Sequence, residues 1–135
     1  MAATVKKKRI LVIDADTDVR LFLSNILNAN AYDSVSVGSV QGARMLFEEL
    51  NPDMIIMDAM MENEAGVELF IEFKCKDGFC EKPVLMLATL DWRTLTLIKK
   101  MRDSAVGRRI PEPEAYLKKP VEAEEVLQLV SQLTG

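Results

Sequence analysis

Hydrophobic residues along this chain follow two alternating patterns. The first is a short run of four or five apolar residues without alternation, which is typical of a strand buried on both faces. Such runs occur at residues 10–13, 54–57 and 84–88. Residues 32–37 alternate and contain Val and Ser, which favours a strand near an edge, and residues 114–117 form a short run. The pattern predicts five strands.

Longer segments of helical spacing separate these strands. In the first segment the apolar residues are spaced i, i+3, i+4, i+7 and i+8, on one face of a helix: Val19, Phe22, Leu23, Ile26 and Leu27. Further helices are predicted after Ser39 and over residues 67–74, 91–101 and 121–133. Strands joined by helical crossovers lie parallel, with helices on both faces. The sequence therefore predicts a single doubly wound (βα)5 α/β domain over residues 1–135.

Composition narrows the classes of function. The 135 residues suit one domain, and the absence of His excludes imidazole catalysis and His metal ligands. A net charge of −4 argues against a nucleic-acid-binding surface, and no apolar run approaches the ~20 residues that a membrane span needs. The two cysteines, Cys75 and Cys80, do not make a disulfide scaffold and fit a reducing compartment. We expect a cytoplasmic protein that binds neither nucleic acid nor membrane.

Polar residues that could take part in binding or catalysis follow the predicted strands. In open parallel sheets ligands bind at the carboxyl ends of the strands. Asp14 follows the first strand, Asp58 the third, Thr89 ends the fourth and Lys119 follows the fifth. If the first and third strands are neighbours, the two carboxylates lie about 4.8 Å apart and need a cation or a shared proton. Mg²⁺ and a Lys could supply the positive charge. Two Asp carboxylates, Mg²⁺, a hydroxyl and a Lys can together accept a phosphoryl group, with one Asp carboxylate as the nucleophile.

Four segments, in order and at the right spacings, resemble the receiver domain of two-component response regulators. They are residues 10–14, 52–61, 83–87 and 116–121 (ILVID, PDMIIMDAMM, PVLML and YLKKPV). The resemblance covers essentially the whole chain. It implies a flavodoxin-like fold with parallel strand order 2-1-3-4-5 and five flanking helices. It also implies a signalling domain and not an enzyme. Such a domain at most catalyses its own phosphorylation and dephosphorylation.

The resemblance assigns roles to individual residues. Asp58 matches the phosphoacceptor, and Asp14 matches the first acid of the family's acidic pair. With these two carboxylates, the backbone carbonyl of Met60 matches a ligand of Mg²⁺. Lys119 matches the lysine that contacts the phosphoryl group, and its bond to Pro120 is expected to be cis.

Two further positions correspond to the family's switch residues, one directly and one displaced by one residue. Tyr116 matches the aromatic residue that turns inward on activation. The family places a hydroxyl immediately after the fourth strand, followed by a small residue, whereas this chain has Ala88-Thr89. A slip of one residue reverses the direction of the side chain. Either Thr89 reaches the phosphoryl group through a local backbone adjustment, as a catalytic and switch residue, or the hydroxyl is missing.

Other departures also weaken the match. Ala15 stands where the family has a second acid that ligates the metal, so weakened Mg²⁺ binding is expected. Asp16 is nearby and is a candidate accessory acid, although a standard turn would point it elsewhere. Glu62 replaces the usual proline.

The leading hypothesis is a phosphoacceptor of a phosphorelay. A histidine kinase or phosphotransfer protein would phosphorylate Asp58, and the domain would then act on a downstream protein or a missing output domain. The alternative is a degenerate receiver that binds partners independently of phosphorylation, as Ala15 and the Ala88-Thr89 order suggest. A third reading, a haloacid-dehalogenase-type phosphatase using Asp14 and Asp16, lacks a paired acidic motif after the fourth strand. Homodimerisation is left open.

Overall fold

The computed structural model describes residues 6–61, 65–76, 78–89, 91 and 111–135. Five parallel strands in these residues form one sheet: β1 (Arg9–Ile13), β2 (Asp33–Val37), β3 (Met54–Asp58), β4 (Val84–Ala88) and β5 (Ala115–Lys118). Their order is β2-β1-β3-β4-β5, so the predicted fold class and strand order are confirmed, with β2 at an edge. Each strand lies within about one residue of its predicted position.

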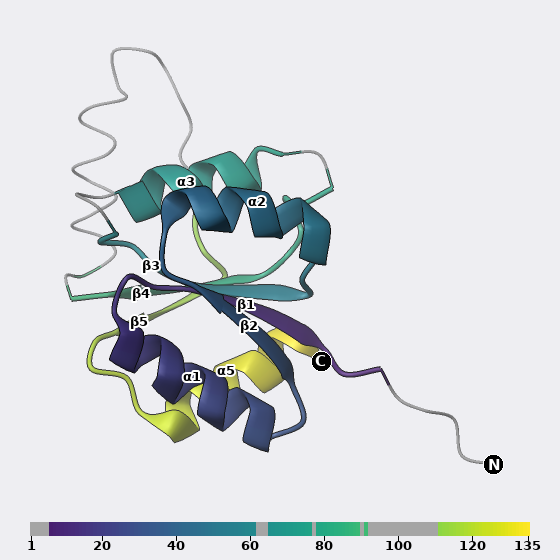
Figure 1. The fold of residues 1–135 in the computed structure, drawn as a ribbon, viewed down its shortest axis with the longest axis vertical. Helices are drawn as coiled ribbons and strands as arrows, with labels where there is room; N and C mark the ends of the chain where they lie inside the picture. The colour runs from purple at the N-terminus through teal and green to yellow at the C-terminus, as the bar shows by residue number, and fades with distance from the viewer. Residues whose placement is uncertain (1–5, 62–64, 77, 90, 92–110) are drawn as a thin grey trace.

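Two layers of helices enclose the sheet. The helices of the described residues are α1 (Thr17–Ala29), α2 (Val40–Leu50), α3 (Ala65–Lys74) and α5 (Ala123–Thr134). The first and last of these, α1 and α5, cover one face, and α2 and α3 cover the other (Figure 1). The helix predicted over residues 91–101 falls almost wholly outside the described residues. None of the helices described has the length and apolar character that crossing a membrane requires.

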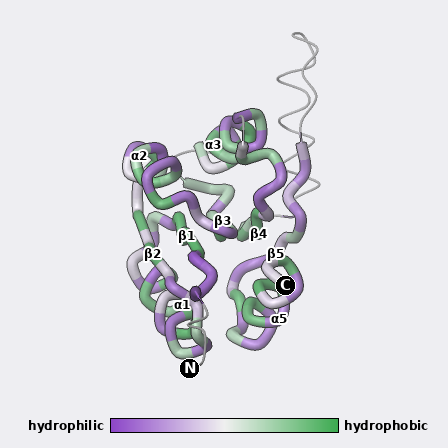
Figure 2. The backbone as a smooth tube through the Cα atoms, turned by 90° about the vertical axis from the view of Figure 1, so that its right-hand side faces the viewer, coloured by the Kyte–Doolittle hydropathy of each residue, from purple (hydrophilic) through white to green (hydrophobic). Residues whose placement is uncertain are grey.

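The sheet is buried on both sides, which explains its unbroken apolar runs. In β4, Val84, Met86 and Ala88 pack towards α2 and α3, whereas Leu85 and Leu87 pack towards α1 and α5. Figure 2 shows the strands between the two helix layers. The buried face predicted for α1 needs one correction, because Phe22 is 37% exposed while Leu23 and Leu27 are fully buried. The apolar arc of α1 is wider than the surface that the sheet and α5 cover.

An ion pair between buried Lys74 and the more exposed Glu114 lies where β4 and β5 begin, at the end of the sheet opposite the strands' carboxyl ends. Lys74 Nζ, at the end of α3, lies 2.5 and 2.7 Å from the two carboxylate oxygens of Glu114, the residue before β5. It also donates to the backbone carbonyls of Cys80 and Lys82, at 3.3 and 2.9 Å. Glu114 Oε1 accepts a bond of 2.8 Å from the N–H of Val84. The pair therefore joins α3 to the starts of β4 and β5.

A close approach of α3 to the sheet positions the end of β3. Gly66, in the first turn of α3, is buried, and a Cβ atom there would lie 2.0 Å from the carbonyl oxygen of Asp58. A side chain at residue 66 would therefore displace either the helix or the backbone of Asp58. Glycine allows the helix to pack directly against the strand end that carries the candidate phosphoacceptor.

Candidate functional site

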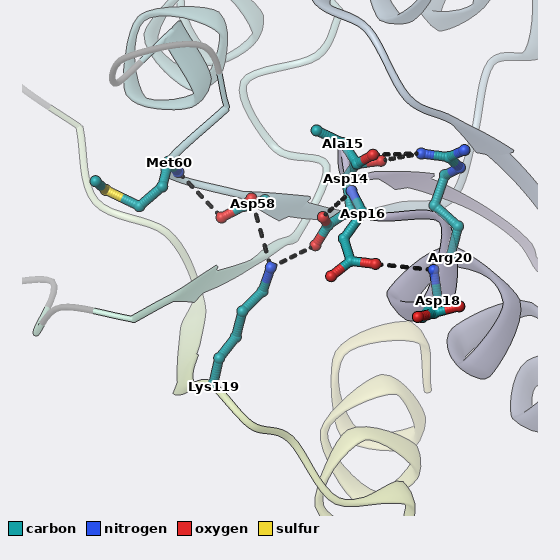
Figure 3. Close-up of polar contacts among 8 residues, drawn as sticks. All are labelled: Asp14, Ala15, Asp16, Asp18, Arg20, Asp58, Met60 and Lys119. Carbon is teal, nitrogen blue, oxygen red and sulfur yellow. Dashed lines mark hydrogen bonds and ion pairs between the residues drawn. The ribbon is translucent and has the colours of Figure 1, made fainter.

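Three charged side chains meet at the carboxyl edge of the sheet (Figure 3). Asp14 follows β1, Asp58 ends the neighbouring strand β3, and Lys119 follows β5. Lys119 Nζ lies 2.7 Å from Asp14 Oδ2 and 3.4 Å from Asp58 Oδ2. One ammonium group therefore bridges two carboxylates that come from the central strand β3 and its neighbour β1.

Backbone hydrogen bonds hold both carboxylates in place. Asp58 Oδ1 accepts a 3.0 Å bond from the N–H of Met60, and Asp14 Oδ1 accepts a 2.9 Å bond from the N–H of Asp16. Asp14 is 1% exposed and Asp58 is 8% exposed. In each residue one oxygen is bound by the loop that follows the strand, which leaves the other directed at Lys119. The peptide bond between Lys119 and Pro120 is cis, as predicted.

The charges in this cluster are not balanced. Burial raises the pKa of Asp58; the N–H of Met60 opposes this rise, the charge of Asp14 adds to it, and Lys119 opposes it. Burial also lowers the pKa of Lys119, but its hydrogen bond to Asp14 and the charge of Asp58 outweigh that effect and raise it. Lys119 is thus a firmly protonated cation beside two buried carboxylates. When both carboxylates are ionised, one negative charge is left over.

This imbalance predicts a pH-dependent gain in stability from Asp58→Asn without metal. Because folding raises the pKa of Asp58, its stabilising contribution is present at low pH and is lost as pH rises through the folded-state pKa. At neutral pH the ionised side chain therefore opposes folding. Asp58→Asn should unfold at a higher temperature than wild type at pH 7. The gain should shrink as pH falls through the raised folded-state pKa and should vanish below about pH 4, the ordinary Asp range. Thermal unfolding in a chelator would measure this.

Asp53→Asn serves as a control, because Asp53 is an exposed carboxylate just before β3. It should not reproduce the gain. An Asp58→Asn midpoint that tracks wild type at every pH would contradict the prediction.

The donor atoms at this edge fit a hard divalent cation. Asp14 and Asp58 supply carboxylate oxygens beside an excess negative charge, and the backbone of Met60 is tied to Asp58. Mg²⁺ is usually held by one or two carboxylates together with waters and phosphate oxygens. Among the described residues, no three acidic or Cys side chains are close enough to hold a metal ion between them. The acidic side chains available are therefore the pair Asp14 and Asp58.

Asp16 is placed as a helix cap. Its carboxylate accepts a 2.8 Å bond from the N–H of Asp18, which satisfies one of the free donors at the start of α1. Its own N–H is bound to Asp14. Its role as an accessory acid remains a prediction, and one that requires the side chain to leave the cap.

The two candidate switch residues lie on opposite sides of the sheet. Thr89 is exposed and lines a groove of about 490 Å³ that also contains Phe22 of α1 and Lys119. Ala88, where the family has its hydroxyl, is buried on the side of α2 and α3. Tyr116, in β5, is partly buried against that same cluster. The displaced hydroxyl therefore lies near Lys119 but away from Tyr116, and the switch roles of both residues remain predictions.

One residue near the site was not identified from the sequence. Arg20 donates 2.6 and 3.1 Å bonds to the carbonyl oxygens of Asp14 and Ala15 (Figure 3). Side chains on a helix lean towards its N-terminus. A basic residue near the start of a helix that follows a candidate loop is therefore the signal that could have revealed it.

Comparisons with known proteins point to one family. The family model described as the response regulator receiver domain matches residues 10–131. The DNA-binding response regulator MtrA of Mycobacterium tuberculosis is 24% identical over 124 residues, which are 92% of this chain and 49% of MtrA. The phosphate regulon transcriptional regulatory protein PhoB of Pseudomonas aeruginosa is 26% identical over 80 residues, 59% of this chain and 35% of PhoB. The chain thus spans about half the length of MtrA and about a third of the length of PhoB.

Solved structures share the fold. The chemotaxis response regulator CheY4 of Vibrio cholerae matches with a TM-score of 0.76 at 23% identity, covering 95% of this chain and 99% of CheY4. The family match spans most of the 135 residues and includes all five strands except the first residue of β1. This chain belongs to the response regulator receiver domain family of two-component systems.

Proposed function

We propose that this domain accepts a phosphoryl group on Asp58 and passes the signal on through a protein-interaction face. The observation that carries the proposal is the pair of buried carboxylates bridged by Lys119 at the carboxyl edge of the sheet. A buried carboxylate that faces a fixed cation is a nucleophile with its counter-charge in place.

The transfer can be written from the positions of the side chains. A carboxylate oxygen of Asp58 attacks the phosphorus of the donor, forming a P–O bond as the bond from phosphorus to the donor breaks. The electron pair of that bond leaves with the donor group, which takes up a proton. Lys119, already 3.4 Å from Asp58 Oδ2, would offset charge on the transferred oxygens. The N–H of Met60 holds the other carboxylate oxygen in place.

The magnesium site would use Asp14, Asp58 and the backbone carbonyl of Met60. Members of this family bind Mg²⁺ at the acidic pocket. When bound, Mg²⁺ supplies positive charge that neutralises the phosphoryl oxygens. Because Ala15 contributes no ligand, we expect weaker affinity than in a receiver with two acids in this loop.

The phosphodonor would be a histidine kinase or phosphotransfer protein, which are the partners of receiver domains. MtrA is named as a DNA-binding response regulator, and this chain matches about half of it. The target of the signal would be a downstream protein or an output domain, with homodimerisation an open route. The free cysteines support a cytoplasmic site of action.

A second function, partner binding independent of phosphorylation, is favoured by two observations. Ala15 removes an acidic ligand, and the buried Ala88 leaves no hydroxyl on the side of Tyr116. In that case the pocket would keep its Lys119 bridge as a structural element.

Intact-mass spectrometry after incubation with a small acyl-phosphate donor and Mg²⁺ separates the two functions. We expect the mass of one phosphoryl group on the folded protein. Absence of this adduct, under conditions where a control receiver is phosphorylated, would reject phosphoryl transfer in favour of the binding module.

Restoring the missing acid should strengthen metal binding. Ala15→Asp adds a carboxylate to the loop that holds Asp14, so the dissociation constant for Mg²⁺ should fall by about tenfold, which is ~1.4 kcal/mol. Isothermal titration with MgCl₂ would measure it. Gln41→Asp, which adds the same charge at an exposed position in the first turn of α2, is the control and should have little effect. Equal affinities for the two variants would show that Ala15 is not the weak point.

A further inference from the structure

Arg20 binds the loop between β1 and α1 from the side away from the candidate site. It lies near the start of α1, and its guanidinium turns back towards the loop (Figure 3). Nη1 donates to the carbonyl oxygens of Asp14 and Ala15 at 2.6 and 3.1 Å, and Nη2 lies 3.2 Å from Thr17 Oγ1. One planar group therefore restrains three positions of a four-residue stretch.

Gly38 makes room for this guanidinium. A Cβ atom at residue 38 would lie 2.5 Å from Arg20 Nη1 and 2.9 Å from its Cζ atom. Gly38 directly follows β2, and the carbonyl of the preceding Val37 accepts a 3.1 Å bond from the N–H of Asp14. The guanidinium is therefore enclosed between the loop after β1 and the residue after β2. Even a methyl group at residue 38 would displace it.

The restrained backbone sets the direction of the Asp14 carboxylate. Asp14 Oδ1 is bound by the N–H of Asp16 in the same loop, while Oδ2 faces Lys119. A rotation of the peptide groups between residues 14 and 16 would move that N–H and release the carboxylate. Arg20 holds the carbonyl oxygens of Asp14 and Ala15. Since Ala15 supplies no carboxylate, the contribution of this loop to the site depends on Asp14.

We propose that Arg20 is a positioning residue, seated by Gly38, that holds the loop so that Asp14 faces Lys119 and would be oriented to serve as a ligand of Mg²⁺. The guanidinium fork fixes the directions of its N–H donors, so Nη1 alone can bind both carbonyl oxygens while Nη2 reaches Thr17, whereas a lysine ammonium rotates on a flexible stem. Where metal binding is concerned, the inference rests on the proposed function. The orientation of the loop itself can be tested without metal.

The first test measures the amide hydrogen exchange of Asp16 by NMR, with a chelator present to remove metal ions. Arg20→Ala should speed exchange roughly fivefold to tenfold, as expected when one hydrogen bond is no longer held in place. Gly38→Ala keeps the arginine but displaces it, and should have the same effect. Arg44→Ala is the matched control, because it removes a guanidinium bound to Glu72 on the opposite face of the sheet. Wild-type exchange at Asp16 in both Arg20→Ala and Gly38→Ala would overturn the inference.

The second test is the affinity for Mg²⁺, measured by titration on folded variants. Loss of a group that orients a metal ligand typically weakens binding by about 10-fold or more. We expect this for Arg20→Ala and Gly38→Ala and not for Arg44→Ala. Arg20→Lys keeps the charge without the fork and should not recover wild-type affinity; full recovery would overturn the positioning role in favour of a charge effect.

The two tests separate this inference from the proposed function. Altered exchange at Asp16 in a wild-type background that takes up neither Mg²⁺ nor a phosphoryl group would support the role of Arg20 and reject phosphoryl transfer. Unchanged exchange and affinity in Arg20→Ala, with a wild type that is phosphorylated, would do the reverse. Gly38→Ala keeps the tests decisive if Arg20→Ala fails to fold.

Discussion

Asp58→Asn is expected to abolish phosphorylation by an acyl-phosphate donor. The variant keeps the size of the side chain and an oxygen that can accept the bond from the N–H of Met60. It loses the anionic nucleophile, and an amide oxygen does not form a stable acyl phosphate. Intact-mass spectrometry should therefore show the phosphoryl adduct on wild type and none on the variant.

Asp53→Asn provides the comparison for this result. Asp53 precedes the same strand, but its carboxylate binds the N–H of Arg9 at the opposite edge of the sheet. This variant should be phosphorylated like wild type. Equal labelling of Asp58→Asn and wild type would place the acceptor elsewhere in the chain and reject the proposed site.

Lys119→Met is expected to slow the same reaction by roughly 10²-fold, the usual loss when one group that stabilises developing charge is removed. Methionine preserves the apolar stem but removes the ammonium that lies between Asp14 and Asp58. It also removes the interactions with Lys119 that lower the pKa of Asp58, so less of this carboxyl group is ionised. The rate at which the adduct forms, followed by mass spectrometry at saturating Mg²⁺, would measure the effect.

The adjacent residue supplies a matched control. Lys118, the last residue of β5, is exposed, and Lys118→Met removes the same charge one position away. It should react at the wild-type rate. If Lys119→Met also reacts at that rate, the ammonium bridge has no part in the transfer.

The fold was largely predictable because the apolar patterns of its buried strands and of its edge strand are both distinct in the sequence. Unbroken apolar runs at β3 and β4 reflect burial on two faces, and alternation at β2 reflects its place at an edge. Phe22 was placed on the buried face of α1 because helical spacing alone does not report how much surface the neighbours cover. The structure leaves it 37% exposed at the rim of a groove.

The meeting of Asp14, Asp58 and Lys119 was predictable because parallel strands end at one edge. The partners of Arg20 were not, since they are carbonyl oxygens and a space left by Gly38, and neither leaves a side-chain pattern in the sequence. The ion pair between Lys74 and Glu114 was not predicted from the sequence for a related reason. They lie 40 residues apart and meet only because α3 and β5 are brought together by the sheet.

The strand β5 is anchored by ions at both of its ends. Glu114, before the strand, is tied to Lys74 and to the first residue of β4, and Lys119, after it, is tied to Asp14 and Asp58. Sliding by one residue, about 3.3 Å, would break both anchors at once. Among the described residues β5 pairs only with β4, so its other side carries no further strand. A new charge on Asp58 would act on the ion pair of Lys119 and leave that of Glu114 in place, so we expect any displacement to fall on the residues between them, which include Tyr116.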